Sequence, residues 1–80
     1  MNELLLNLNK LHTTPLGIER IKRNLKLDNI DVVLYLKNVI KDKNSLISKN
    51  GKNYYVKNND IIITINSYSY TIITAHKLKK

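Results

Sequence analysis

The chain has 80 residues and a formal net charge of +8, with 14 basic residues, 6 acidic residues and no cysteine. This length is typical of one domain, and the lack of cysteine excludes disulfides and thiolate metal sites. No apolar stretch has the length of a signal peptide or a transmembrane helix. We therefore expect a single domain, soluble in the cytoplasm.

The basic excess gives a sequence pI of about 9.8. Such a charge favours a polyanionic partner, either nucleic acid or an acidic protein. An alternative interpretation is a biased composition, rich in lysine and asparagine, that has no role in binding. Charge therefore predicts a class of partner and no fold.

Three helices are predicted in the first half of the chain. Residues 2–11 carry leucines near the spacing of an amphipathic helix. Thr14 is followed by proline, a helix start that predicts a second helix over residues 15–25. Asp28 is predicted to cap a third helix over residues 29–41, and we expect that helix to pack against a sheet.

The second half has the alternating pattern of strands. Asn50-Gly51 is its strongest hairpin signal, because both positions tolerate a positive φ in a type I′ turn. Strands are expected over residues 45–49, 52–57, 61–66 and 70–77. The prediction is one α+β domain over residues 1–80, in which three N-terminal helices precede a four-stranded antiparallel β-meander.

The last predicted strand carries the main candidates for a functional site. Successive side chains on a strand point to opposite faces. We therefore expect Tyr70, Ile72, Thr74 and His76 on an open face, and Ile73 against the helices. Cross-strand neighbours lie about 5 Å apart, so hydroxyl, amide and imidazole groups are expected to converge there.

These residue types suit metal-independent cleavage of RNA by its own 2′-hydroxyl. A histidine carries protons near neutral pH, while basic and hydroxyl groups stabilise charge on the phosphate. We expect His76 to be the acid or base and Thr74 to donate to the phosphate. His12 would be a second proton carrier, and Arg20 would stabilise the charge. No metal and no cofactor is expected.

Further basic and polar side chains are candidates for binding the nucleic acid: Lys22, Arg23, Asn66, Tyr70, Lys77 and Lys79. The catalytic candidates also have structural interpretations. His76 would then be a surface residue, and Thr74 a residue chosen for its strand propensity. On the same interpretation His12 belongs to a helix-capping segment, and Arg20 to a solvated helix face.

Two stretches carry a family resemblance: residues 11–25, LHTTPLGIERIKRNL, and residues 70–77, YTIITAHK. Through them nearly the whole chain resembles a family of small bacterial proteins, domain of unknown function 3781. That resemblance implies no activity. The order of helices and sheet is also similar, as a fold alone, to the barnase–EndoU–colicin–RelE group of ribonuclease toxins.

Three hypotheses about function follow. The first is a metal-independent endoribonuclease, a toxin or defence effector, with RNA as substrate and an antitoxin, immunity protein or defence complex as protein partner. The second is a non-catalytic protein, either a basic nucleic-acid-binding module or a small inhibitor from a phage or mobile element. The third is a module that binds an acidic protein through an edge strand. The oligomeric state stays open.

Overall fold

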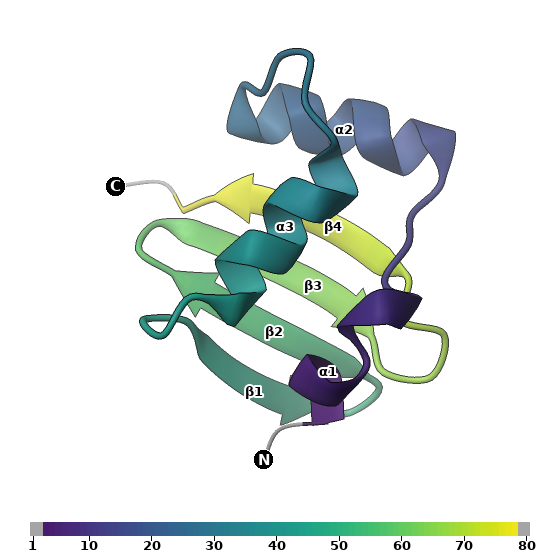
Figure 1. Cartoon of the computed structure of the whole chain (residues 1–80), viewed down its shortest axis with the longest axis vertical. Helices are drawn as coiled ribbons and strands as arrows, with labels where there is room; N and C mark the ends of the chain where they lie inside the picture. Colours follow the sequence, from purple (N-terminus) through teal and green to yellow (C-terminus); the bar gives the residue numbers. More distant parts are fainter. Residues whose placement is uncertain (1–2, 79–80) are drawn as a thin grey trace.

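Residues 3–78, the part described by the computed structural model, fold into a four-stranded antiparallel sheet with helices packed against it (Figure 1). The helical segments are α1 (Glu3–Leu6), the 3-10 helix η1 (Leu8–Lys10), α2 (Pro15–Leu25) and α3 (Val32–Lys41). The strands are β1 (Leu46–Asn50), β2 (Asn53–Asn58), β3 (Ile61–Asn66) and β4 (Ile72–Lys77), which pair in chain order. The α+β class and the order of the meander are confirmed.

The first helix is shorter than the predicted residues 2–11, of which residue 2 lies outside the described part. Helix α1 ends at Leu6, and Asn7 leaves the helical conformation with φ −122° and ψ 24°. The Asn7 side chain donates to the carbonyl of Glu3 at 2.9 Å, as asparagine often does where helices break. Two short turns therefore bury Leu4 and Leu11, in place of one amphipathic helix.

Helix α2 begins where the sequence places it. The Thr14 hydroxyl accepts a hydrogen bond from the Gly17 amide at 3.0 Å, and proline follows at the first helical position. The helix ends at Leu25, and its C-cap residue Lys26 has a left-handed conformation with φ 55°. A lysine here means that the usual C-terminal glycine signal is missing.

Helix α3 begins at Val32, later than the predicted residue 29. Its N-cap is Asp31, whose carboxylate accepts from the Leu34 amide at 3.1 Å. Asp28 instead lies in the preceding turn, where its carbonyl accepts from the Ile30 amide at 2.7 Å. Two aspartates three positions apart are equally good caps, and the preference for Asp28 was wrong.

The β1–β2 turn is centred on Gly51-Lys52, one residue later than predicted. Gly51 has φ 61° and Lys52 has no positive φ, which is the pattern of a type II′ turn rather than type I′. Lys49 therefore pairs with Tyr54 and not with Lys52. The shift is two positions along β2, so each side chain keeps its predicted face.

Strand β4 contains a β-bulge that reverses part of the expected alternation. Thr74 pairs with Thr64, but Ile72 pairs with Ile65, so Ile73 is the extra residue. Ile72 is accordingly 1% exposed and packs in the core, while Ile73 is 47% exposed. The predicted positions of these two isoleucines are therefore exchanged, whereas Thr74 keeps the face expected for it.

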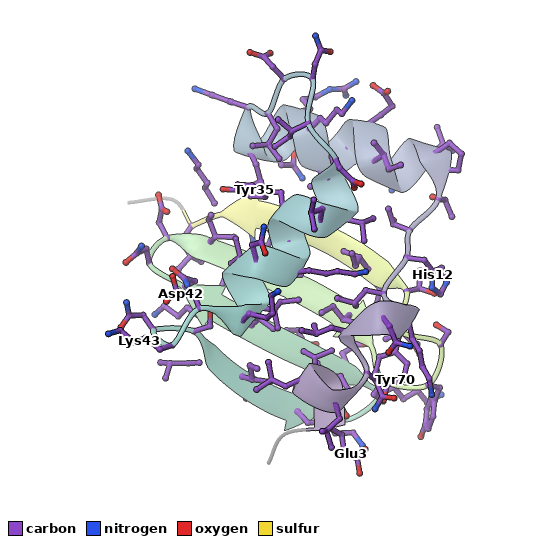
Figure 2. All side chains as sticks on the ribbon, in the orientation of Figure 1. Glu3, His12, Tyr35, Asp42, Lys43 and Tyr70 are labelled. Atoms are coloured by element: carbon purple, nitrogen blue, oxygen red, sulfur yellow. The ribbon has the colours of Figure 1, made fainter. Side chains whose placement is uncertain are left out.

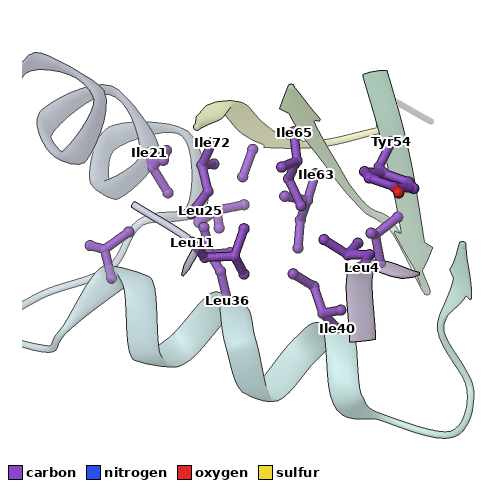
Figure 3. Packing of buried hydrophobic residues seen from close by; sticks show 13 residues of the cluster. Leu4, Leu11, Ile21, Leu25, Leu36, Ile40, Tyr54, Ile63, Ile65 and Ile72 are labelled. Atoms are coloured by element: carbon purple, nitrogen blue, oxygen red, sulfur yellow. The ribbon is translucent and has the colours of Figure 1, made fainter. Parts of the chain in front are cut away.

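The core lies between one face of the sheet and the helices (Figure 3). Helix α3 crosses this face, and α2 runs beside β4 (Figure 1). The buried apolar side chains are Leu4, Leu11, Ile21, Leu25, Val32, Leu36, Ile40, Tyr54, Val56, Ile63, Ile65, Ile72 and Ala75. No helix within residues 3–78 has the length and apolarity needed to cross a membrane.

Candidate nucleic-acid interface

The face of the sheet turned away from the core carries two rows of side chains that run across all four strands. The register places Ser48, Tyr55, Thr64 and Thr74 in the central row. The next row toward the end of β4 holds Leu46, Lys57, Ile62 and His76. We call these eight residues, together with Ile73, the open face.

The register and burial of β4 confirm that the Thr74 and His76 side chains share one face of the sheet. The flanking residue Ala75 is fully buried, so the side chains on either side of it point away from the core. Thr74 lies opposite Thr64, and His76 lies opposite Ile62. His76 is exposed, and Thr74 is half-buried within the row.

Tyr55 occupies the middle of the open face. Its cross-strand neighbours are Ser48 on β1 and Thr64 on β3, both shorter than tyrosine. The Asn53 side-chain amide donates to the Tyr55 hydroxyl at 3.4 Å. Because Asn53 is two positions away on the same strand, this contact directs the phenol along β2.

Tyr70 lies on the helix side of the sheet, contrary to the prediction that it shares a face with Thr74 and His76. Its ring stacks on buried Tyr54, with centroids 6.4 Å apart and planes at 27°. The Lys10 ammonium lies 5.7 Å from the Tyr70 ring centre, within cation–π range. Tyr70 has φ 57°, and this left-handed conformation turns its side chain to the helix side instead of the open face that strand alternation predicts.

Burial raises the pKa of the Tyr54 phenol above its ordinary value of 10.0, and neighbouring Tyr70 and Glu3 raise it further. Tyr54 as a whole residue is 4% exposed. Losing its proton would place a negative charge in a partly desolvated site beside Tyr70 and Glu3. Tyr54 therefore stays protonated and acts as a packing residue.

Asn66 shapes the loop between β3 and β4 rather than presenting its side chain for binding. Its side-chain oxygen accepts from the amides of Tyr68 at 2.9 Å and Ser69 at 3.0 Å. Its backbone amide donates to the Thr71 carbonyl at 2.9 Å. The predicted role of Asn66 in binding therefore competes with its role in the loop.

His12 forms a second polar group with two hydroxyls of that loop, at the end of the sheet seen near Tyr70 in Figure 2. Nδ1 of His12 lies 2.9 Å from the carbonyl of Lys10, and Nε2 lies 3.0 Å from Thr71 Oγ1. Thr71 Oγ1 in turn lies 2.7 Å from Ser69 Oγ. We call His12, Ser69 and Thr71 the His12 cluster.

The hydrogen-bond partners set the tautomer of neutral His12. A carbonyl only accepts, so Nδ1 carries the hydrogen and donates to Lys10. Nε2 is then an acceptor and receives the Thr71 hydroxyl hydrogen. Thr71 lies beside the last residue of β3 and one position before buried Ile72, so its side chain borders the open face.

The structure does not bring the four predicted catalytic residues together. His12 pairs with Thr71 just before β4 begins, and His76 lies five positions further along that strand. At the rise of an extended strand this separation is about 16 Å. Arg20 is exposed on α2, and within residues 3–78 no hydrogen bond joins it to either histidine.

The remaining basic candidates lie outside the open face. Lys22 is half-buried and Arg23 is exposed on α2. Lys77 lies at the end of β4 opposite Ile61, and Lys79 is outside the described residues. Within residues 3–78 there is no cluster of three side chains able to hold a metal ion.

Tyr55, Thr71 and Ser69 are among the residues of these two sites that the sequence analysis did not name. Tyr55 could have been found, since alternation from buried Val56 places it in a row with Thr64. Thr71 and Ser69 could not, because Thr71 reaches His12 across a separation of 59 residues and Ser69 joins the cluster only through Thr71. Only the folded chain brings them together.

The fold and its surfaces define a small α+β domain with one face of the sheet buried and the other uncovered by helices. Residues 5–76 match the family described as "Protein of unknown function (DUF3781)", and the chain belongs to that family. The match includes His12, Tyr55 and His76. No curated protein and no solved structure matched the chain, and the similarity to ribonuclease toxins stays a prediction.

Proposed function

We propose that the protein binds single-stranded RNA on the open face of its sheet. The observation that carries this proposal is Tyr55, an aromatic ring between small hydroxyl residues on a face that no helix of residues 3–78 covers. Proteins that bind single strands combine such an aromatic platform with basic side chains that follow the phosphates. Lys57, two positions along β2, supplies a charge of this kind.

The chemistry of the surrounding residues agrees with RNA as the ligand. Thr64 and Thr74 offer hydroxyls that donate to phosphate or ribose oxygens, and exposed His76 adds a donor in the neighbouring row. The chain's charge of +8 attracts a polyanion from a distance. A base on the Tyr55 ring and a phosphate near Lys57 would use both kinds of group at once.

Binding of a fluorescein-labelled oligo(U) strand, followed by fluorescence anisotropy, tests this function. Stacking on one aromatic residue contributes about 1–3 kcal/mol, so Tyr55→Ala should weaken binding by about fivefold or more. Tyr55→Phe keeps the ring and should bind nearly as the parent does. If Tyr55→Ala binds as tightly as the parent, the open face is not the binding surface.

A matched pair of charge variants separates site binding from general attraction. Lys57→Ala and Lys41→Ala each remove one positive charge, but Lys41 is exposed on α3, on the helix side. Lys57→Ala should weaken binding more than Lys41→Ala. Equal losses would mean that the net charge, and no particular surface, attracts the RNA.

Cleavage of the bound RNA is a second candidate function, and the orientation of His12 favours it. Its Nδ1–H is held by the Lys10 carbonyl, so Nε2 faces a hydroxyl as an acceptor. A ribose 2′-hydroxyl in place of the Thr71 hydroxyl would lose its proton to Nε2 while its oxygen attacks phosphorus. The bond to the 5′-oxygen breaks, that oxygen takes a proton from water, and a 2′,3′-cyclic phosphate remains.

Incubation with RNA in the presence of a metal chelator tests this reaction. The parent and His76→Ala should both release cyclic-phosphate ends, because His76 is too far from His12 to share its phosphate. His12→Ala should lose the activity. Thr71→Val, which removes the same hydrogen bond but keeps the imidazole, should retain it. If the folded parent cuts no RNA, or if His12→Ala cuts as well, His12 is no general base.

A further inference from the structure

The two edges of the sheet differ in whether their outward-facing backbone groups have partners. Along β4 the outer edge is covered by the segment that leads into α2. The backbone carbonyl of His12 accepts from the Ile72 amide at 2.7 Å, and the Thr13 hydroxyl donates to the Ile72 carbonyl at 3.0 Å. Further along, the Asn24 side chain donates to the Ala75 carbonyl at 3.2 Å. This edge is therefore closed to another strand.

The register of the β1–β2 hairpin shows which backbone groups of β1 point outward. Asn50 and Asn53 flank a two-residue turn and must exchange both of their ladder hydrogen bonds. Counting back in steps of two, Ser48 and Leu46 also bond to β2. The N–H and C=O groups of Ile47 and Lys49 therefore point away from the sheet, and nothing in residues 3–78 bonds to them.

The side chains around this open edge are positively charged. From position 41 to position 57 the chain has five lysines and one acidic residue, Asp42. Lys43 lies with Asp42 in the loop that leads into β1 (Figure 2). Lys49 lies on β1 itself and Lys52 in the turn at its other end. A strand added here would pass between positive charges at both ends.

We propose that the outer edge of β1 binds an extended, acidic segment of a partner protein as a fifth strand of the sheet. Backbone hydrogen bonds to Ile47 and Lys49 provide the pairing, as in other cases of strand addition. Half-buried Ile47 and exposed Leu46 offer apolar contacts on the two faces. Lys49 takes a carboxylate on the helix side, which gives the preference for an acidic sequence.

Charge selects this occupant over two others. A second copy of the chain would bring another charge of +8 against the lysines of the edge. RNA lacks the regularly spaced backbone donors and acceptors that satisfy a strand edge. An acidic polypeptide has both the backbone and the complementary charge. This site shares Leu46 with the open face, but its backbone pairing does not depend on the proposed RNA binding.

Lys49 allows a substitution that blocks the edge without removing a bond to β2. Lys49→Pro removes the outward N–H, and proline is tolerated on edge strands at such positions. Lys49→Thr removes the same charge but keeps the N–H, so it is the matched control. Thermal unfolding followed by circular dichroism shows whether both variants keep the fold.

Calorimetric titration with a short peptide of alternating glutamate and valine tests the proposal. The parent should bind this peptide and should not bind a lysine–valine peptide. Lys49→Pro should lower the affinity about tenfold or more, because it removes a main-chain hydrogen bond and admits no strand. Lys49→Thr should lower it by about fivefold at most, as expected for loss of one exposed ion pair.

Backbone-amide hydrogen exchange of the parent gives a second readout that needs no variant. The glutamate–valine peptide should slow exchange at the Ile47 and Lys49 amides and leave the Ser48 amide, already bonded to β2, unchanged. The proposal is overturned if Lys49→Pro binds the peptide as the parent does, or if these two amides stay unprotected. Protection by oligo(U), or by self-association of the protein without peptide, would overturn it as well.

Discussion

His12 and Thr71 are 59 positions apart in the chain, yet Nε2 of the imidazole lies 3.0 Å from the threonine hydroxyl. The two residues also form a parallel bridge, in which the His12 amide donates to the Tyr70 carbonyl at 3.3 Å. This pairing attaches the segment before α2 to the first residues of β4. It also turns the acceptor nitrogen of His12 toward the border of the open face.

Thr71→Val should lower the free energy of unfolding by about 0.5–1.5 kcal/mol, because it removes a hydroxyl that bonds to His12 and Ser69. Urea denaturation followed by circular dichroism measures the difference. Thr71→Ser keeps the hydroxyl and loses a methyl group, so it should cost less. If Thr71→Ser is the more damaging change, the methyl contact stabilises the protein and the hydroxyl does not.

Gly17→Ala should destabilise the protein although it lies in a helix, where alanine is normally preferred. A Cβ on Gly17 would collide with Thr13 Oγ1, which donates to the Ile72 carbonyl on β4. The collision displaces a side chain that covers the sheet edge. Thermal unfolding should therefore show a lower midpoint for Gly17→Ala than for the parent.

The cause of that loss can be checked in a second background. Thr13→Ala removes the colliding oxygen and leaves Thr14 Oγ1, at 3.2 Å, as the nearest remaining atom. Adding Gly17→Ala to Thr13→Ala should then cost less than adding it to the parent. Equal costs in the two backgrounds would show that the collision with Thr13 is not the reason.

Stability should fall in alkaline solution because of Tyr54. The folded protein raises the pKa of this phenol above 10.0, so the unfolded chain releases the proton at a lower pH than the folded one. The contribution is fully present below pH 10.0 and is lost as the pH rises through the folded pKa. Urea denaturation at a series of pH values should show a decline above that point.

Tyr54→Phe should reduce this alkaline decline, since it has no proton to lose. The lysines also titrate in this range, but they are common to both proteins and cancel in the comparison. If Tyr54→Phe and the parent lose stability in parallel, the buried phenol is not responsible for the decline.

RNA affinity should fall as the salt concentration rises from about 50 to about 200 mM, because binding releases cations from the phosphates. For a single strand each phosphate contact contributes about 0.7 to the slope of log affinity against log salt. Lys57→Ala should reduce the slope by about that amount. Lys41→Ala, on the helix side, should leave it unchanged, and an affinity that does not vary with salt would argue against phosphate contacts.

Local signals in the sequence predicted a helix or strand correctly where only one residue, or one run of residues, could form its start or its length. Thr14 before proline marks the start of α2, and β-branched residues mark β3. The predictions were wrong where two residues compete for one role. Asp28 and Asp31 are both of a residue type that caps helices, and only Asp31 does so here. Gly51 suits either the second central position of a type I′ turn or the first of a type II′ turn.

The arrangement of the site was less predictable, because tertiary contacts decide it. Alternation placed Thr74 and His76 together correctly, but the bulge exchanged the faces of Ile72 and Ile73, and no local signal marks it. The left-handed Tyr70 belongs to the helix side for a similar reason. The contact of His12 with Thr71 depends on how α2 docks beside β4.

The central claim, that RNA binds on the open face, is tested most directly by backbone-amide NMR during titration with oligo(U). We predict that the amides of Tyr55, Thr64, Thr74 and His76 shift together and saturate with one affinity, while those of α3 stay in place. Shifts confined to α3 or to the lysines of α2, or an absence of saturable shifts on β2, β3 and β4, would contradict the account.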